Sequence, residues 1–165
     1  MSNKAAKIVR DALKKEMGLS SAHVSVRSAP CGGSTKIRVT IKVPCDGRRV
    51  EAISKRSRYE HICDKSGDLL LGGNTYVTVS YDESVWKAKA AAAAALFAEA
   101  EADPGRFVHL PGGFFVVYYP TGFALGYRYP EFTMPDMRYS GAGGAAAAYA
   151  KAFVEVTHAG SECAG

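Results

Sequence analysis

Basic side chains recur at alternate positions of one short stretch of this 165-residue chain, where they could bind an anion. In an extended strand, neighbouring side chains point to opposite faces, so Lys36, Arg38 and Lys42 would share one face and the intervening Ile and Val residues the other. Arg27 continues the pattern on a preceding strand, before the turn at residues 29–34. The spacing therefore predicts a hairpin with a cationic outer face and an apolar inner face.

More basic residues follow a turn at residues 44–47. They enlarge the predicted cationic surface, which would attract nucleic acid or a nucleoprotein. The added candidates for binding are Arg48, Arg49, Lys55, Arg56 and Arg58. The pattern of residues 48–58 leaves two structures open, a short helix or a third strand followed by a loop.

The positive charge belongs to one half of the chain. Residues 1–81 hold 15 Lys and Arg against 7 Asp and Glu, whereas residues 82–165 hold 6 against 9. The formal net charge of +5 conceals this asymmetry. A one-sided basic field favours polyanionic partners, although a solvated basic surface with no partner has the same composition.

Residues suited to catalysis are scattered. The four histidines and four cysteines show no CxxC pair and no spacing typical of a metal site or a nucleophile triad. The glycine-rich turns at residues 31–34 and 71–74 lack the lysine of a phosphate-binding loop. We therefore expect no enzyme, no catalytic residues, no metal and no cofactor.

Three helices and two sets of strands must position these residues. Apolar residues at spacings of three and four predict an amphipathic helix over residues 3–17, which would cover the apolar face of the hairpin. An alanine-rich helix follows from Asp82, which is suited to cap it. A strand is predicted at residues 75–81, and the alanine-rich helix is predicted to span residues 82–103. The elements predicted after it are strands at 106–110, 114–119 and 123–129, a loop at 130–144, a helix at 145–156 and a disordered tail at 157–165.

These elements predict an α+β fold in which amphipathic helices pack on antiparallel sheets. We interpret residues 1–156 as one domain, with a basic lobe at 1–81 and an aromatic lobe at 82–156 as the alternative. No apolar run is long enough to span a membrane, and the N-terminal residues do not resemble a signal peptide, so we expect a cytoplasmic protein without membrane contact.

Aromatic residues concentrate in the second half, with ten of the seventeen between residues 107 and 139. The predicted strands there are apolar on both faces. The final helix would cover one face, or that face would be exposed to a partner protein or to stacked bases. The candidates for a protein interface are Tyr118, Tyr127, Tyr129 and Phe132.

Several short motifs occur in the order found in one family. The motifs are Ile8-Val9-Arg10 with Leu13-Lys14, residues 23–28, Gly32-Gly33-Ser34 before Ile37-Arg38-Val39, residues 50–53, and residues 69–77. Over residues 4–81 the chain resembles the large polyvalent protein-associated domain, twenty-ninth class, of phages and conjugative plasmids. The resemblance implies a role in delivering or protecting invading DNA, and it carries no catalytic residues.

The resemblance and the basic half together suggest two functions. The first is a small non-enzymatic inhibitor from a mobile element that binds and blocks a host defence nucleoprotein, of the anti-CRISPR or antirestriction type, in the bacterial cytoplasm. The alternative is an accessory protein that binds nucleic acid through the basic hairpin face. The expected partner is a host defence complex in the first case and nucleic acid in the second.

Overall fold

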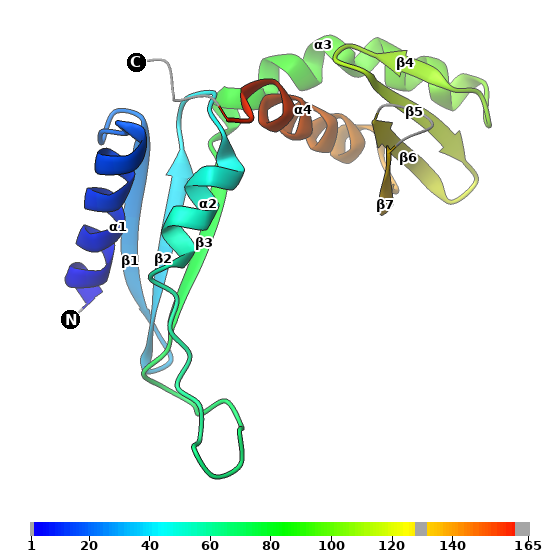
Figure 1. The fold of residues 1–165 in the computed structure, drawn as a ribbon. Helices are drawn as coiled ribbons and strands as arrows, with labels where there is room; N and C mark the ends of the chain where they lie inside the picture. The colour runs from blue at the N-terminus through cyan, green and yellow to red at the C-terminus, as the bar shows by residue number, and fades with distance from the viewer. Residues whose placement is uncertain (1, 128–131, 161–165) are drawn as a thin grey trace. The chain divides into compact units, whose positions relative to one another are not determined.

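The chain forms two compact units with separate cores. The computed structural model describes residues 2–127 and 132–160, without the side chains of residues 2, 3 and 132–137 (Figure 1). Unit 1 comprises residues 1–85 with 158–165, and unit 2 comprises residues 86–157. The predicted α+β class is confirmed, and the division falls close to the alternative boundary between residues 81 and 82.

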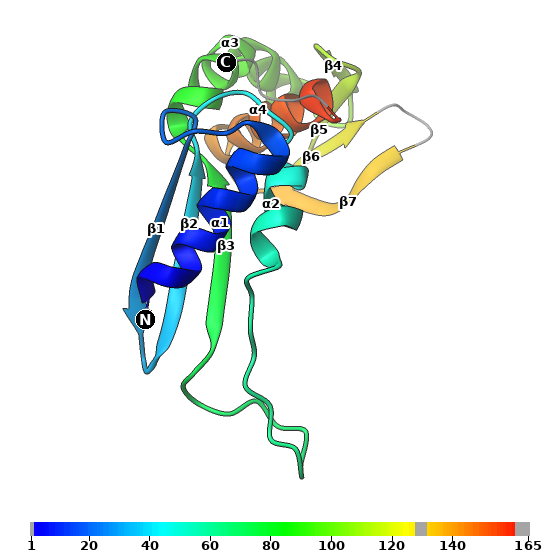
Figure 2. The ribbon, with the colours of Figure 1, turned by 60° about the vertical axis from the view of Figure 1, so that its left-hand side comes forward.

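Unit 1 is a three-stranded mixed sheet covered on one face by two helices (Figures 1 and 2). Its elements are α1 (Ser2–Met17), β1 (Val24–Cys31), β2 (Ser34–Ile41), α2 (Gly47–Lys55) and β3 (Thr75–Tyr81). The hairpin pairs β1 with β2 in the antiparallel sense, whereas β3 pairs with β2 in the parallel sense. A parallel neighbour requires a crossover connection, and α2 supplies it.

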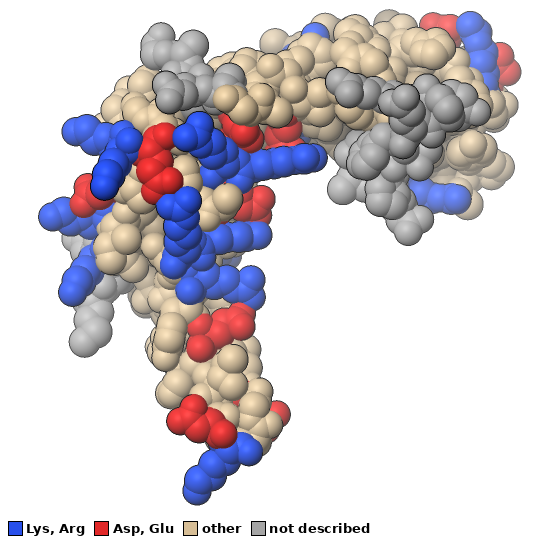
Figure 3. Space-filling model, in the orientation of Figure 1, with Lys and Arg blue, Asp and Glu red and all other residues tan. Residues whose placement is uncertain are grey.

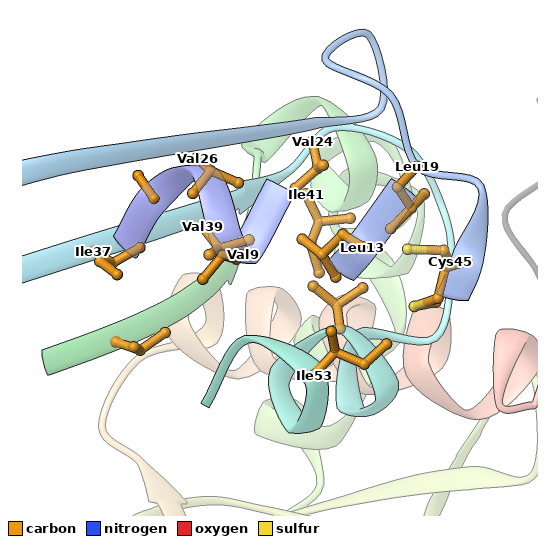
Figure 4. Close-up of a cluster of buried hydrophobic side chains, with 14 residues drawn as sticks. Val9, Leu13, Leu19, Val24, Val26, Ile37, Val39, Ile41, Cys45 and Ile53 are labelled. Atoms are coloured by element: carbon orange, nitrogen blue, oxygen red, sulfur yellow. The ribbon is translucent and has the colours of Figure 1, made fainter. Parts of the chain in front are cut away.

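The core of unit 1 lies between the helices and the apolar face of the sheet (Figure 4). Ile37 and Val39 of β2 are fully buried, as is Leu13 of α1. The predicted amphipathic helix and the predicted alternation along β2 are both confirmed. Burying one face of the sheet commits the intervening side chains of β2 to the other face.

The segment with two open interpretations begins as the helix α2. Asp46 caps it, because its Oδ1 accepts a hydrogen bond from the backbone N of Arg49 at 3.1 Å. Gly47 N donates to Tyr81 Oη at 2.9 Å, and that hydroxyl donates to the carbonyl of Cys45 at 2.9 Å. Tyr81 therefore fixes the start of the crossover against the end of β3.

Unit 2 packs an antiparallel sheet against two alanine-rich helices. Its elements are α3 (Glu83–Ala102), which begins in unit 1, β4 (Val108–Leu110), β5 (Phe114–Tyr119), β6 (Gly122–Tyr127), β7 (Phe132–Tyr139) and α4 (Ala142–His158). The strand order is β4-β5-β6-β7. Small buried residues such as Ala93, Ala100 and Ala145 let the backbones approach closely around Phe97 and Tyr149.

The prediction of a loop over residues 130–144 is wrong, because β7 occupies residues 132–139. Proline and glycine around this segment favoured a loop. Proline is nevertheless tolerated in an edge strand, where one side makes no ladder hydrogen bonds, and β7 is at the edge of its sheet. The final helix is longer than predicted and includes residues 157 and 158 of the expected tail; residues 161–165 lie outside the described chain.

Replacing Gly126 with Ala should destabilise unit 2. Gly126 lies on β6 directly under the ring of Phe115, and a Cβ atom at this position would overlap that ring. Overpacking of this kind costs about 1–3 kcal/mol. Thermal unfolding followed by circular dichroism measures the loss. Gly143→Ala is the matched control, because a Cβ atom there meets nothing within 4 Å; equal unfolding temperatures for the two variants would contradict the prediction.

Candidate nucleic-acid interface

The face of the unit 1 sheet opposite α1 and α2 is polar and basic. We call it the cationic face, defined by Arg27 on β1 and Lys36, Arg38 and Lys42 on or just after β2. The strand register sets these residues in rows, with Lys36 beside Tyr76 of β3 and Arg38 beside Arg27. Arg27, Arg38 and Lys42 are exposed, and Lys36 is half-buried.

Two arginines lie directly opposite each other on this face. Arg27 and Arg38 are cross-strand partners in the β1–β2 ladder. Like charges at directly opposite positions of a sheet are destabilising. Among the described residues, no carboxylate forms an ion pair with Arg27, Lys36 or Arg38. The protein itself therefore leaves this repulsion uncompensated, and a bound anion would relieve it.

A shallow hollow of about 260 Å³ occupies the end of the cationic face near α3. The residues that line it are Ser25, Arg27, Arg38, Thr40, Lys42 and Asp82. Hydrogen bonds from Ser84 and, less strongly, the charge of Lys42 lower the pKa of the Asp82 carboxyl. The hollow therefore combines three cations and hydroxyl donors with one ionised carboxylate at its rim.

The other predicted basic residues lie elsewhere. Because α2 packs on the opposite face of the sheet, Arg48, Arg49 and Lys55 do not extend the cationic face. Arg56 and Arg58 follow α2 in the chain. Arg48, Arg49 and Lys55 therefore do not form one continuous patch with the cationic face, and a role of this group in binding stays a prediction.

Carboxylates of unit 1 compensate much of this second group. Lys55 Nζ lies 2.6 Å from Glu51 Oε1, and Arg56 Nη1 lies 2.6 Å from Glu16 Oε1. Arg58 pairs with Glu60, and Arg49 donates to the carbonyl of Glu16. On the side that carries α1 and α2, Lys and Arg predominate, with Asp and Glu side chains between some of them (Figure 3).

A long excursion between α2 and β3, here called the arm (residues 59–74), projects beyond the sheet (Figures 1 and 2). Asn74 closes its base: its Oδ1 accepts from His61 N at 2.6 Å, and its Nδ2 donates to the carbonyl of Leu70 at 2.9 Å. Large apolar side chains are exposed along the arm: Tyr59, Ile62, Leu69, Leu70 and Leu71. Leu71 is fully exposed, so the arm offers apolar surface to solvent or to a partner.

The two described aromatic interface candidates, Tyr118 and Tyr127, pack against the core of unit 2. Tyr118 and Tyr127 are half-buried, and their rings lie 4.8 Å from Phe123 and 4.7 Å from Phe114 between centroids. Tyr129 and the side chain of Phe132 lie outside the described residues. The two described tyrosines thus contribute to packing, and only part of each is accessible to a partner.

Few side chains that could ligate a metal ion lie close together in the described parts of the chain. No cluster of three or more His, Cys, Asp or Glu that could hold a metal ion occurs within residues 2–127 and 132–160. The Cys63 thiol lies on the arm, where hydrogen bonds from Ser66 lower its pKa. No described helix combines the length and apolar content needed to cross a membrane.

Comparison of the chain with protein-family models, curated proteins and solved structures finds no significant match. The resemblance over residues 4–81 therefore stays a prediction. Sequence reasoning found the four cations of the face from their alternation, but it missed the direct pairing of Arg27 with Arg38 and the position of Asp82. The pairing depends on the register of the hairpin, and the position of Asp82 depends on the parallel placement of β3; the alternation of side chains specifies neither.

Proposed function

We propose that this protein is a non-enzymatic binding protein that contacts the phosphate backbone of nucleic acid, free or within a nucleoprotein, through the cationic face of unit 1. The observation that carries the proposal is the pair Arg27 and Arg38, opposed on an exposed sheet surface without a carboxylate partner among the described residues. Lys36 and Lys42 continue the positive charge along β2 in both directions.

The chemistry of the cationic face suits phosphate better than it suits a neutral ligand. Guanidinium groups present several donors in a planar fork that matches phosphate oxygens. The hydroxyls of Ser25 and Thr40 lie in the next row and offer further donors. The hollow is shallow and polar, which fits a polymer lying across the surface rather than an enclosed small molecule.

Binding of oligonucleotides tests this proposal directly. Purified protein should bind fluorescein-labelled oligonucleotides of random sequence, and the affinity should fall steeply as salt rises from 50 to 200 mM. Each phosphate contact releases counterions, so it adds about 0.7 to 0.9 to the negative slope of the logarithm of the binding constant against the logarithm of the salt concentration. Fluorescence anisotropy measures both quantities. The proposal would be refuted if neither single-stranded nor duplex oligonucleotides bound detectably at 50 mM salt.

Removing the carboxylate at position 82 should tighten binding. The ionised Asp82 lies at the rim of the hollow, where it repels phosphate. Asp82→Asn removes the charge and retains a good residue for capping α3, since Asn and Asp are equally favoured at this position. We expect the affinity to rise about threefold. Glu101→Gln on the exposed surface of α3 is the matched control, and an equal rise in both variants would indicate only a change in net charge.

The arm supports a second candidate, inhibition of a host defence nucleoprotein of the anti-CRISPR or antirestriction type. Such a complex offers a nucleic-acid surface to the cationic face and an apolar protein surface to Leu69, Leu70 and Leu71. A protein that bound only free nucleic acid would gain nothing from so much exposed apolar surface. The two candidates differ in whether the arm contributes to function.

Substitution on the arm separates the two candidates. Leu69, Leu70 and Leu71 changed together to Ser should abolish protection of phage in a bacterial strain with an active defence system, while oligonucleotide binding stays unchanged. If protection persists, or if the wild-type protein gives none against any defence system tested, the inhibitor candidate fails and simple nucleic-acid binding remains.

A further inference from the structure

A second cationic cavity lies on the helical side of β1. Its volume is about 460 Å³, and its walls come from α1, the following loop and β1. Arg10, Lys14, Arg27 and Lys42 contribute four positive charges, and Asp11 contributes the one carboxylate of its lining. The floor is apolar, since Leu19, Val24 and Val26 line the cavity and are buried. We call it the α1–β1 groove.

The groove and the cationic face are continuous. Ser25, Arg27 and Lys42 line both the groove and the hollow on the sheet face. β1 is an edge strand of its sheet, so only one strand separates the two surfaces. Adjacent strands lie about 4.8 Å apart, and long side chains of this strand and its neighbour reach around the edge. Positive charge therefore runs without a break from Arg38, over the edge, to Arg10 and Lys14.

The free edge of β1 is poorly suited to pair with another strand. Arg10 Nη2 donates to the edge carbonyl of Val26 at 3.0 Å and occupies that acceptor. Pro30, farther along the same edge, has no N–H to offer. Both features block the pairing that an extended peptide would need. The basic walls and apolar floor instead fit a chain of phosphates whose sugars and bases have apolar faces.

We infer that the ligand of this surface is single-stranded nucleic acid, which passes from the cationic face over the edge of β1 into the α1–β1 groove. The inference rests on the proposed function. A duplex is stiff over about 50 nm and cannot turn around a single strand edge, whereas a single strand can. Tyr76 lies next to Lys36 at the opposite end of the face and offers a ring on which a base can stack.

The test compares ligand forms and surface variants of the full chain. Affinities are measured by fluorescence anisotropy for a 20-nucleotide deoxythymidine strand, a 20-nucleotide uridine strand and a 20-base-pair duplex. We expect at least one of the single strands to bind about tenfold more tightly than the duplex at the same salt. The two single strands distinguish DNA from RNA, and preference for either one supports the inference.

The variant Arg10→Ala with Lys14→Ala removes both cations that α1 contributes to the groove. It should weaken single-strand binding about tenfold. The slope of the logarithm of the binding constant against the logarithm of the salt concentration should become shallower by about 1.4, because each phosphate contact to a single strand contributes about 0.7 to that slope. Duplex binding should change less than about twofold. The control, Lys7→Ala with Lys15→Ala, removes the same charge from exposed positions of α1 that do not line the groove.

The possible failures separate the two proposals. Equal or tighter binding of duplex, or equal losses in the groove variant and its control, would overturn the single-strand path while leaving the cationic face as a nucleic-acid surface. Absence of salt-dependent binding to every oligonucleotide would overturn the proposed function itself. Unchanged circular dichroism of both variants establishes that the differences arise at the surface.

Discussion

Changing Lys36, Arg38 and Lys42 together to Glu should abolish oligonucleotide binding and leave the fold intact. These side chains lie on the face of the sheet that α1 and α2 do not cover. Each lost phosphate contact is worth about 1 kcal/mol at an exposed site, so three losses weaken binding at least about 100-fold. The unfolding temperature should change by less than about 6 °C, because three surface substitutions of up to about 0.5 kcal/mol each sum to about 1.5 kcal/mol, and 1 kcal/mol shifts a chain of this size by about 2–4 °C.

The matched control places the same charge reversal on the opposite side of the sheet. Lys55, Arg56 and Arg58 changed together to Glu give the same net charge, but these residues pair with carboxylates of unit 1. We expect the control to lose less than about fivefold in affinity, through weaker long-range attraction. Equal losses in the two variants would show that overall charge, rather than the cationic face, governs binding.

The cationic face could be predicted because alternation in a strand allows only two assignments of its side chains. Once Ile37, Val39 and Ile41 are buried, Lys36 and Arg38 must lie on the other face. The direct opposition of Arg27 and Arg38 could not be predicted in the same way. It depends on the register of the hairpin, and a shift of two residues would keep the same faces while changing every partner.

The second basic group shows that a local sequence pattern does not specify on which face of the sheet a later segment packs. Residues 48–58 contain enough basic residues for a larger patch, but whether they join the cationic face depends on the path of the chain. The parallel pairing of β3 with β2 places α2 over the apolar face, which removes Arg48 and its neighbours from the patch. The α1–β1 groove was missed for the same reason: Arg10 and Arg27 are far apart in sequence.

In unit 2, composition predicted the helices and most strands, including the edge strand β4, but not the edge strand β7. Alanine-rich sequence and the cap at Asp82 identify α3 with little ambiguity. β7 contains Pro135, and its register against β6 shifts between Ala124 and Gly126. Because an edge strand needs hydrogen bonds on one side only, it tolerates such irregularity, and neither β-propensity nor turn signals identify it reliably.

Replacing Phe97 with Ala should cause the largest loss of stability in unit 2. Phe97 is fully buried between the helices and the sheet, with ring centroids 5.8 Å from Phe123 and 6.2 Å from Tyr149. Removal of a buried Phe ring costs about 3–5 kcal/mol through lost burial and the remaining cavity. Trp86, the single tryptophan, lies in unit 2, so its fluorescence during denaturation by urea follows the change.

Phe107→Ala is the control for this substitution, because the same side chain is removed from a position that is 47 % exposed. The control should lose less than about 1.5 kcal/mol, since much of the ring is already in water. Both variants should bind oligonucleotides with wild-type affinity while Trp86 fluorescence reports a folded unit 2, because the cationic face belongs entirely to unit 1. Similar losses of stability in the two variants would show that Phe97 is not central to the core. Loss of binding in a folded Phe97→Ala protein would show that unit 2 takes part in recognition.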